Sequence, residues 1–225
     1  MTLRWYGQSA FLLSGERRVF IDPFGPMTGL AERGLTFDYP AIEGVEADLL
    51  LVPHEHRDHN GVDAVGGSPQ VVRSLAGTFE TPVGEVVGVA SEHDERAGTQ
   101  RGANVMFRFA LDDLRIGHLG DLGQAALRAE QVAAFGRVDV LMIPVGDGPT
   151  IGGERAAQVV RELRPRLVVP MHHRTPAVNF LEPPDAFLAA LGADVHRIDA
   201  SEADPADHLG SPEAPAVLLL TAPRR

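Results

Sequence analysis

The chain has 225 residues, of which 44% are hydrophobic and 23% charged, and this is the composition of a soluble globular protein that can bury a substantial core. Its net charge of −11 argues against a nucleic-acid partner, because phosphate binding relies on clustered Lys and Arg. Cysteine is absent, which excludes disulfides, thiolate metal ligands and Cys nucleophiles, so any metal must be held by nitrogen and oxygen.

No apolar stretch approaches the roughly 20 residues that span a bilayer, and the N-terminus lacks the pattern of a signal peptide. We therefore expect no membrane partner and a cytoplasmic location. The length fits one large domain, and we expect residues 1–225 to form it.

The first part of the chain predicts a β-hairpin between residues 2 and 24. An apolar run at Ala10–Leu13 is followed by a turn at Ser14–Glu16 and a second run at Val19–Pro23. The next segment, Gly25–Glu46, is rich in Gly and Pro and has no clear periodicity. Because loops of this length are uncommon and often functional, we expect it to form a wall of an active site.

The remainder alternates between short strands and helices, which indicates an α/β layered domain. Several of the apolar runs are continuous, as in strands that are covered on both faces. The predicted strands are Leu49–Val52, Val71–Val72, Val86–Val89, Asn104–Phe109, Leu114–His118, Val138–Ile143, Leu167–Pro170 and Ala216–Thr221. The predicted helices are Ala125–Phe135, Glu154–Leu163 (which ends before Pro165) and Pro184–Leu191, and Ser201–Pro215 reads as an acidic loop.

Three imidazoles and a carboxylate follow the strand at Leu49–Val52 within six residues: His54, His56, Asp58 and His59. Imidazole and carboxylate are ligands for divalent transition metals. His54 and His56 share a side if the segment is extended, whereas Asp58 and His59 project elsewhere as the chain turns. This spacing predicts two neighbouring metals, each of which needs further ligands from distant segments.

Three later positions can supply those ligands, and each lies at or just after the end of an apolar strand. They are His93, Asp121 and His172, with His173 as the alternative to His172. The carboxyl ends of strands in open α/β sheets are where ligand sites gather. Each residue by itself could have a purely structural role. That three such residues occur together with the first cluster is difficult to explain by chance.

The motif His54-x-His56-x-Asp58-His59, followed by His93, Asp121 and His172 in that order, resembles the metallo-β-lactamase superfamily. Further segments resemble the L-ascorbate-6-phosphate lactonase-like branch of metal-dependent hydrolases. These segments are Gly7–Ala10, Ile21–Phe24, His118–Asp121, Asp139–Gly146 and Pro170–His172. The chain departs from that branch at Gln8, where His is frequent, and at His173, where Tyr is frequent; both positions are expected to border the pocket.

The resemblance implies a four-layer αβ/βα sandwich with two facing sheets and helices outside. It implies one metal on His54, His56 and His93, and a second on Asp58, His59 and His172, with Asp121 bridging the two. Zn or Mn suits this set of nitrogen and oxygen ligands, and Fe or Ni remains an alternative. Asp22 is a candidate partner for the second ring nitrogen of a ligand His, or else a turn residue.

A two-metal centre predicts hydrolysis, since paired divalent ions supply hydroxide at neutral pH and Asp58 can orient the water or accept its proton. We expect a small ester, lactone or similar substrate, with Asp58 and Asp121 as the catalytic carboxylates. Arg96, Arg101 and Arg174 follow candidate ligands and could bind an anionic group or lie on the surface. A phosphodiesterase for a small phosphate diester and a non-catalytic metal- or metabolite-binding protein are the alternatives.

Overall fold

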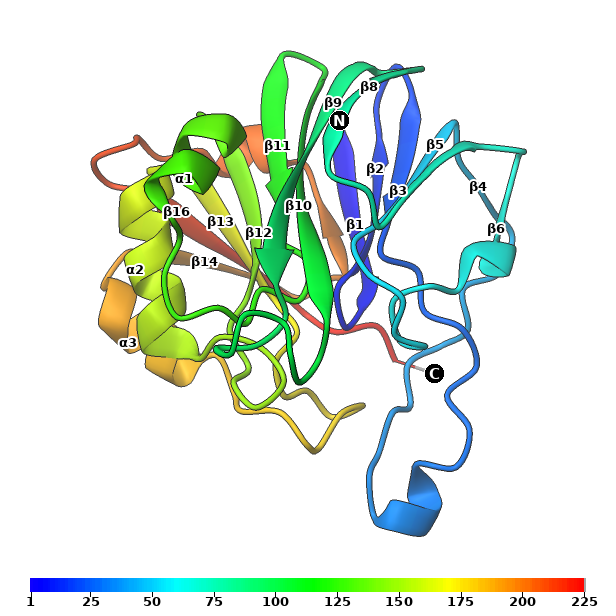
Figure 1. Cartoon of the computed structure of the whole chain (residues 1–225). Coiled ribbons are helices and arrows are strands. Elements are labelled where there is room, and N and C mark those ends of the chain that lie inside the picture. Colours follow the sequence, from blue (N-terminus) through cyan, green and yellow to red (C-terminus); the bar gives the residue numbers. More distant parts are fainter. Residues whose placement is uncertain (225) are drawn as a thin grey trace.

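Two β-sheets pack face to face, as the computed structural model of the chain shows for residues 1–224 (Figure 1). The six-stranded sheet has the order β15-β1-β2-β3-β5-β7, and the eight-stranded sheet the order β14-β16-β13-β12-β11-β10-β9-β8. The strands of the first sheet are β1 (Thr2–Gly7), β2 (Ala10–Ser14), β3 (Arg18–Ile21), β5 (Leu49–Val52), β7 (Gln70–Arg73) and β15 (Glu202–Ala203). The strands of the second are β8 (Gly77–Thr81), β9 (Gly84–Glu92), β10 (Ala103–Leu111), β11 (Leu114–His118), β12 (Val140–Pro144), β13 (Leu167–Met171), β14 (Asp194–Ile198) and β16 (Ala216–Leu220). A small parallel pair, β4 (Val45–Glu46) and β6 (Val65–Gly66), stands beside them.

The continuous apolar runs are strands that are buried on both faces, as predicted. In β5, Leu49 and Leu51 point into the core between the sheets, while Leu50 and Val52 pack on the outer face. In β12, Val140 and Met142 face the same central core and Leu141 faces the helices. Since side chains alternate along a strand, a run without polar residues fits only a strand that is covered on both sides.

The α-helices of the described chain all belong to the layer outside the eight-stranded sheet (Figure 1). They are α1 (Ala129–Phe135), α2 (Gly153–Leu163) and α3 (Asp185–Leu191). Helix α2 ends at Leu163, as the sequence predicted, and the capping residue Arg164 adopts the left-handed conformation immediately before Pro165. None of the helices in residues 1–224 has the length and apolar character needed to cross a membrane.

The layer outside the six-stranded sheet consists of the loops between β3 and β7, together with Ala177, Val178 and Leu181 from the segment after β13. Phe24, Tyr39 and Ile42 from these loops pack against Phe20 and Leu50 of the sheet. Apart from the strands β4, β5 and β6, the chain between β3 and β7 is irregular and contains two short 3₁₀ turns, Ala31–Arg33 and Val62–Ala64. The predicted loop Gly25–Glu46 is therefore confirmed except at its end, where Val45–Glu46 form β4. The α/β sandwich is likewise confirmed, with irregular chain in place of helices on this one face.

Some of the predicted boundaries are wrong. The first α-helix begins at Ala129 and not at Ala125. The Ala126 carbonyl oxygen accepts a hydrogen bond from the side-chain amide of Gln124, and the Arg128 N–H donates to the side chain of Gln131, which caps the helix. The expected acidic loop contains β15 and a 3₁₀ turn, Pro205–His208. Strand β1, in which buried and exposed residues alternate, and the more exposed strands β8 and β14 lack a continuous apolar run, and the sequence analysis did not predict them.

Candidate metal centre

The candidate ligands occupy four segments that all follow the carboxyl end of a strand. His54 to His59 follow β5, His93 follows β9, Asp121 follows β11 and His172 follows β13. The first of these strands belongs to the six-stranded sheet and the others to the eight-stranded sheet. The segments meet at one edge of the sandwich, where residues more than a hundred positions apart come into contact.

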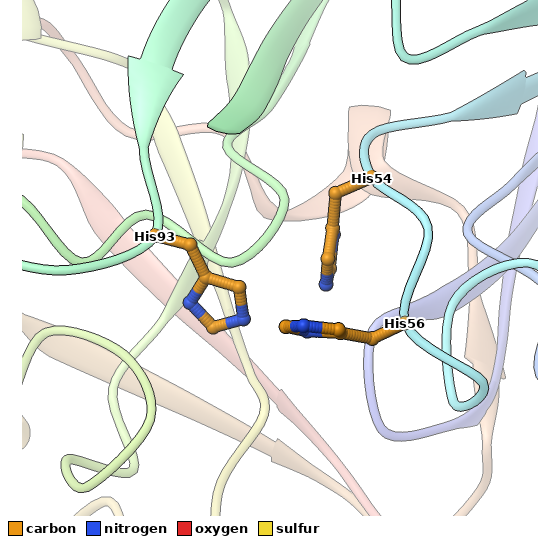
Figure 2. A group of neighbouring side chains, drawn as sticks. All are labelled: His54, His56 and His93. Atoms are coloured by element: carbon orange, nitrogen blue, oxygen red, sulfur yellow. The ribbon is translucent and has the colours of Figure 1, made fainter. Parts of the chain in front are cut away.

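His54, His56 and His93 form one group. Their potential ligand atoms all lie within 4.8 Å of one another, and Figure 2 shows the three rings converging from the loop after β5 and the end of β9. The ring centroids are 4.9 Å apart for His54 and His56, 4.8 Å for His54 and His93, and 4.9 Å for His56 and His93. His54 and His93 are buried, whereas His56 is exposed.

Asp58, His59 and His172 form a second group within the same 4.8 Å limit. The Nε2 atom of His59 lies 3.1 Å from Oδ2 of Asp58, and the rings of His59 and His172 stack with centroids 5.7 Å apart. His172 adopts a left-handed backbone with φ 48°. His173 donates from Nδ1 to the Arg174 carbonyl oxygen and packs on Trp5, and it is His172 that joins the group.

Asp121 lies between the two groups. Its Oδ2 atom is 3.2 Å from Nε2 of His59, 3.2 Å from Nε2 of His93 and 3.3 Å from Nε2 of His172. The distance to Nε2 of His54 is 3.8 Å, and His54, His59 and Asp121 form a third group of potential ligands. A single carboxylate therefore contacts imidazoles of both groups.

Asp22 is in contact with the centre through His59. The Nδ1 atom of His59 lies 2.7 Å from Oδ1 of Asp22, and both side chains are fully buried. Burial raises the pKa of Asp22 to about 7, against the lowering effect of His59. A carboxylate on the far ring nitrogen is the usual partner of a metal-binding His. The alternative that Asp22 is only a turn residue does not account for this contact, although its φ of 62° shows that it also makes a turn.

The electrostatics of the centre favour a bound cation. Burial lowers the pKa of His59, but the surrounding carboxylates of Asp121, Asp22 and Asp58 together raise it well above its ordinary value. Burial lowers the pKa of His54 to about 2, so that this imidazole is neutral and has a free lone pair. Buried carboxylates need compensating positive charge, and neutral imidazoles can share them with a metal.

The buried polar atoms also fit a metal. Atoms of five candidate ligands have no hydrogen-bond partner among the described residues: Nδ1 and Nε2 of His54, Nε2 of His59, Nδ1 of His93, Oδ1 of Asp121 and Nδ1 of His172. A buried polar atom without a partner costs about 1–3 kcal/mol. Imidazole nitrogen and carboxylate oxygen are the donors that divalent transition metals bind, so the residues present fit such ions.

Two supporting residues were not predicted. Asn104 is buried; its amide donates to Ser91 Oγ and the Leu119 carbonyl, and its own Oδ1 accepts from the backbone N–H of Asp121 at 3.0 Å. The available signal was an Asn at the start of the predicted strand Asn104–Phe109, which is otherwise apolar except for Arg108.

The other unpredicted residue is Glu55, between two candidate ligands. Its carboxylate accepts hydrogen bonds from Arg73 at 2.6–3.0 Å and from Ser74 at 2.7 Å. Since Arg73 and Ser74 lie at the end of β7, Glu55 ties the ligand loop to the neighbouring strand. Among the arginines considered from sequence, Arg174 donates to the Leu181 carbonyl and thus braces its own loop.

A cavity of about 770 Å³ adjoins the centre at His93. Its lining includes Arg96, Arg101 and Arg155, together with Asp147 and Gly148 of the turn after β12. Arg155 is paired with Glu95 at 2.7 Å, whereas no ion pair within residues 1–224 involves Arg96 or Arg101. The long loop Gly25–Glu46 instead lines a separate cavity of about 560 Å³, whose walls include Phe24 and Tyr39. The first residue of this loop contacts the segment His54 to His59, because the Gly25 N–H donates a hydrogen bond to the Arg57 carbonyl oxygen at 3.4 Å.

Two facing sheets with a His and Asp cluster at the carboxyl edge of their strands define a metal-dependent hydrolase of the metallo-β-lactamase type. A family model described as the beta-lactamase superfamily domain matches residues 2–172. The chain belongs to this superfamily.

Its curated relatives are metal-dependent hydrolases. A UPF0173 metal-dependent hydrolase of Thermococcus kodakarensis is 31% identical over 200 residues, which is 77% of this chain and 84% of the relative. A UPF0173 metal-dependent hydrolase of Thermus thermophilus is 32% identical over 199 residues, with the same shares of both chains. The protein is thus a metal-dependent hydrolase.

Solved structures agree with this assignment. A Thermotoga maritima protein described as a Zn-dependent hydrolase of the metallo-β-lactamase superfamily has a TM-score of 0.76 and 27% identity, with 98% of each chain covered. An isothiocyanate hydrolase from Delia radicum gut bacteria shares the fold with a TM-score of 0.63 and 15% identity, covering 85% of this chain and 93% of its own.

Proposed function

We propose that the chain is a two-metal hydrolase of a small ester, lactone or related substrate. The first ion would be held by His54, His56 and His93, and the second by Asp58, His59 and His172. Asp121 would bridge them, and the observation that carries the proposal is its Oδ2 atom, within 3.2–3.3 Å of three imidazole nitrogens from both groups. The nitrogen and oxygen donors suit Zn or Mn, with Fe or Ni as alternatives.

A pair of divalent ions at such a site supplies hydroxide near neutral pH and polarises the oxygen of the substrate. The chain's own contribution is to orient the reactants. Asp58 is 22% exposed, against 2% for Asp121, so it is the carboxylate that a substrate or water can approach. Burial raises its pKa, but His59 lowers it to a net value below the ordinary range, so Asp58 is ionised and can orient the attacking water by accepting a hydrogen bond from it.

The cavity beside His93 is the proposed substrate site, and its size suits a small molecule. Its lining includes Arg96 and Arg101, for which no ion pair is found within residues 1–224, beside the acidic Asp147 and Glu154. We propose that the two arginines bind an anionic group on the substrate, which also makes a small phosphate diester the second candidate. We further propose that residues 1–225 act as one domain in the cytoplasm without a nucleic-acid partner, which the net charge of −11 supports.

The test is turnover by metal-loaded protein. The protein is stripped with a chelator, reloaded with Zn²⁺ or Mn²⁺, and assayed on ester, lactone and phosphodiester panels beside a His54→Ala/His56→Ala control. Hydrolysis of esters or lactones that requires metal and is absent in the control supports the first proposal, and selective cleavage of phosphodiesters supports the second. Two bound ions with no turnover on any panel would instead support a non-catalytic binding protein.

A further inference from the structure

Gln8 lies in the turn between β1 and β2, and its backbone is in the left-handed region with φ 51°. Its side chain is 1% exposed. A residue other than Gly is uncommon in this conformation, which costs free energy unless the surroundings hold it in place. The contacts that hold Gln8 lead to the metal centre.

The side chain of Gln8 contacts one of the candidate ligands directly. Its Nε2 atom donates a hydrogen bond to Oδ2 of Asp58 at 3.1 Å, and the same oxygen lies 3.1 Å from Nε2 of His59. The carboxylate of Asp58 is therefore held through Oδ2 by a neutral donor. This contact limits the rotation of the carboxylate and determines where Oδ1 points.

The main chain of the same turn contacts two other ligand segments. The carbonyl oxygen of Gln8 accepts from the backbone N–H of His172 at 3.1 Å and from Nε1 of Trp5 at 3.0 Å. The carbonyl oxygen of Ser9 lies 2.9 Å from Nε2 of His118, whose Nδ1 accepts from the Gly120 N–H next to Asp121. One turn thus joins the segments after β5, β11 and β13.

These contacts favour one metal position over the other. Gln8 bonds to Asp58 and His172, which are both in the second group. Within residues 1–224, no hydrogen bond joins Gln8 to His54, His56 or His93 of the first group. We propose that Gln8 is a positioning residue for the second metal, acting through Asp58 and His172; this inference rests on the proposed two-metal function.

The experiment measures metal binding and not only activity. Gln8→Met keeps the length of the side chain and removes the amide, whereas Gln8→His keeps an N–H donor and tolerates a left-handed backbone. Gln131→Met is the matched control, because Gln131 is also buried and hydrogen-bonded but lies on α1. Each protein is equilibrated with buffered Zn²⁺ for metal counting and with Co²⁺ for its visible absorption spectrum, and the Tm of each metal-free protein is recorded.

We expect Gln8→Met to bind the second ion 10- to 100-fold more weakly, so that its metal content falls from two towards one per chain. Its Co²⁺ spectrum should lose the contribution of that ion, and Gln8→His should restore both. Gln131→Met should lower the Tm without changing metal content. If Gln8→Met does not fold, Gln8→Asn, whose amide is one methylene shorter, replaces it with the same expected loss.

Two results overturn the inference in distinguishable ways. In the first, wild-type protein binds two ions and Gln8→Met also binds both, with unchanged affinity and an unchanged Co²⁺ spectrum. This result refutes the role of Gln8 and leaves the two-metal centre standing. Wild-type protein that binds a single ion refutes the two-metal centre and the role of Gln8 together.

Discussion

The Nδ1 atom of His59 lies 2.7 Å from Oδ1 of Asp22, and neither side chain is accessible to solvent. When the imidazole of His59 is neutral, as a metal ligand must be, the ring nitrogen that faces the carboxylate keeps the proton and the lone pair lies on Nε2. That Nε2 atom faces Asp58 and Asp121 at 3.1 and 3.2 Å. A carboxylate 37 residues earlier in the chain therefore sets the tautomer and the orientation of a candidate ligand.

Replacement of Asp22 by Asn tests this relationship. Asn tolerates the left-handed backbone at φ 62°, so Asp22→Asn removes the charge with little change in backbone strain. We expect metal affinity to fall about 10- to 100-fold, measured by competition with a chromophoric chelator. Asp113→Asn, which also has a left-handed backbone but lies in the turn before β11, should leave affinity unchanged. Equal affinities for Asp22→Asn and wild type would contradict the orienting role.

The proposed bridging role of Asp121 predicts different metal losses in two variants. Asp121→Ala should release both ions, because its carboxylate lies between the two groups. His93→Ala should mainly weaken the first ion and leave a content near one. Elemental analysis after dialysis gives both values, and retention of two ions by Asp121→Ala would rule out bridging.

The arginines of the cavity predict a change in substrate selectivity. In Arg96→Ala/Arg101→Ala we expect KM for anionic substrates to rise about tenfold, the equivalent of about 1.4 kcal/mol, with kcat nearly unchanged. KM for neutral esters should stay within about twofold of wild type, because a neutral substrate is not attracted by the charge of the two arginines. Arg18→Ala is the control, because Arg18 lies on β3, outside the cavity lining, and is paired with Glu46 at 3.3 Å. An equal rise in KM for neutral and anionic substrates would show that the two arginines do not select substrates by charge.

Asp139 provides a pH dependence away from the metal centre. Burial raises its pKa, but hydrogen bonds from Arg115, at 2.9–3.1 Å, lower it to a net value below the ordinary 3.8. As pH falls past 3.8, the folded state therefore binds fewer protons than the unfolded state. The ion pair of Asp139 and Arg115 thus stabilises the fold above that pH. This contribution to the free energy of unfolding is lost as pH falls through the pKa of Asp139 in the folded state.

We expect Asp139→Asn to lower the free energy of unfolding at pH 7 by about 1–2 kcal/mol, a value reduced from that of a buried pair because Arg115 is 42% exposed. The difference from wild type should narrow below pH 4. Urea unfolding of both proteins with a chelator present measures it without a contribution from metal loss. A difference that stays constant down to pH 3 would exclude ionisation of Asp139 as its source.

Much of the candidate site could be predicted because its information is local. The run His54 to His59 contains the donors themselves, and the apolar strands before it and before His93, Asp121 and His172 indicate which edge of the sheets they share. The buried strands were visible for the same reason, since Leu49–Val52 has no polar residue. More exposed strands such as β8 and β14 have a weaker pattern and were missed.

The relations between distant residues were decided only by the folded chain. Local spacing cannot show that Asp22 faces His59, that the Gln8 amide reaches Asp58, or that Asn104 binds the backbone of Asp121. These contacts depend on which strands become neighbours and on turns with positive φ. The types of candidate ligand and their order are therefore a property of the sequence. Their partners and orientations follow from the packing of the two sheets, because that packing brings four separate strand ends to one edge.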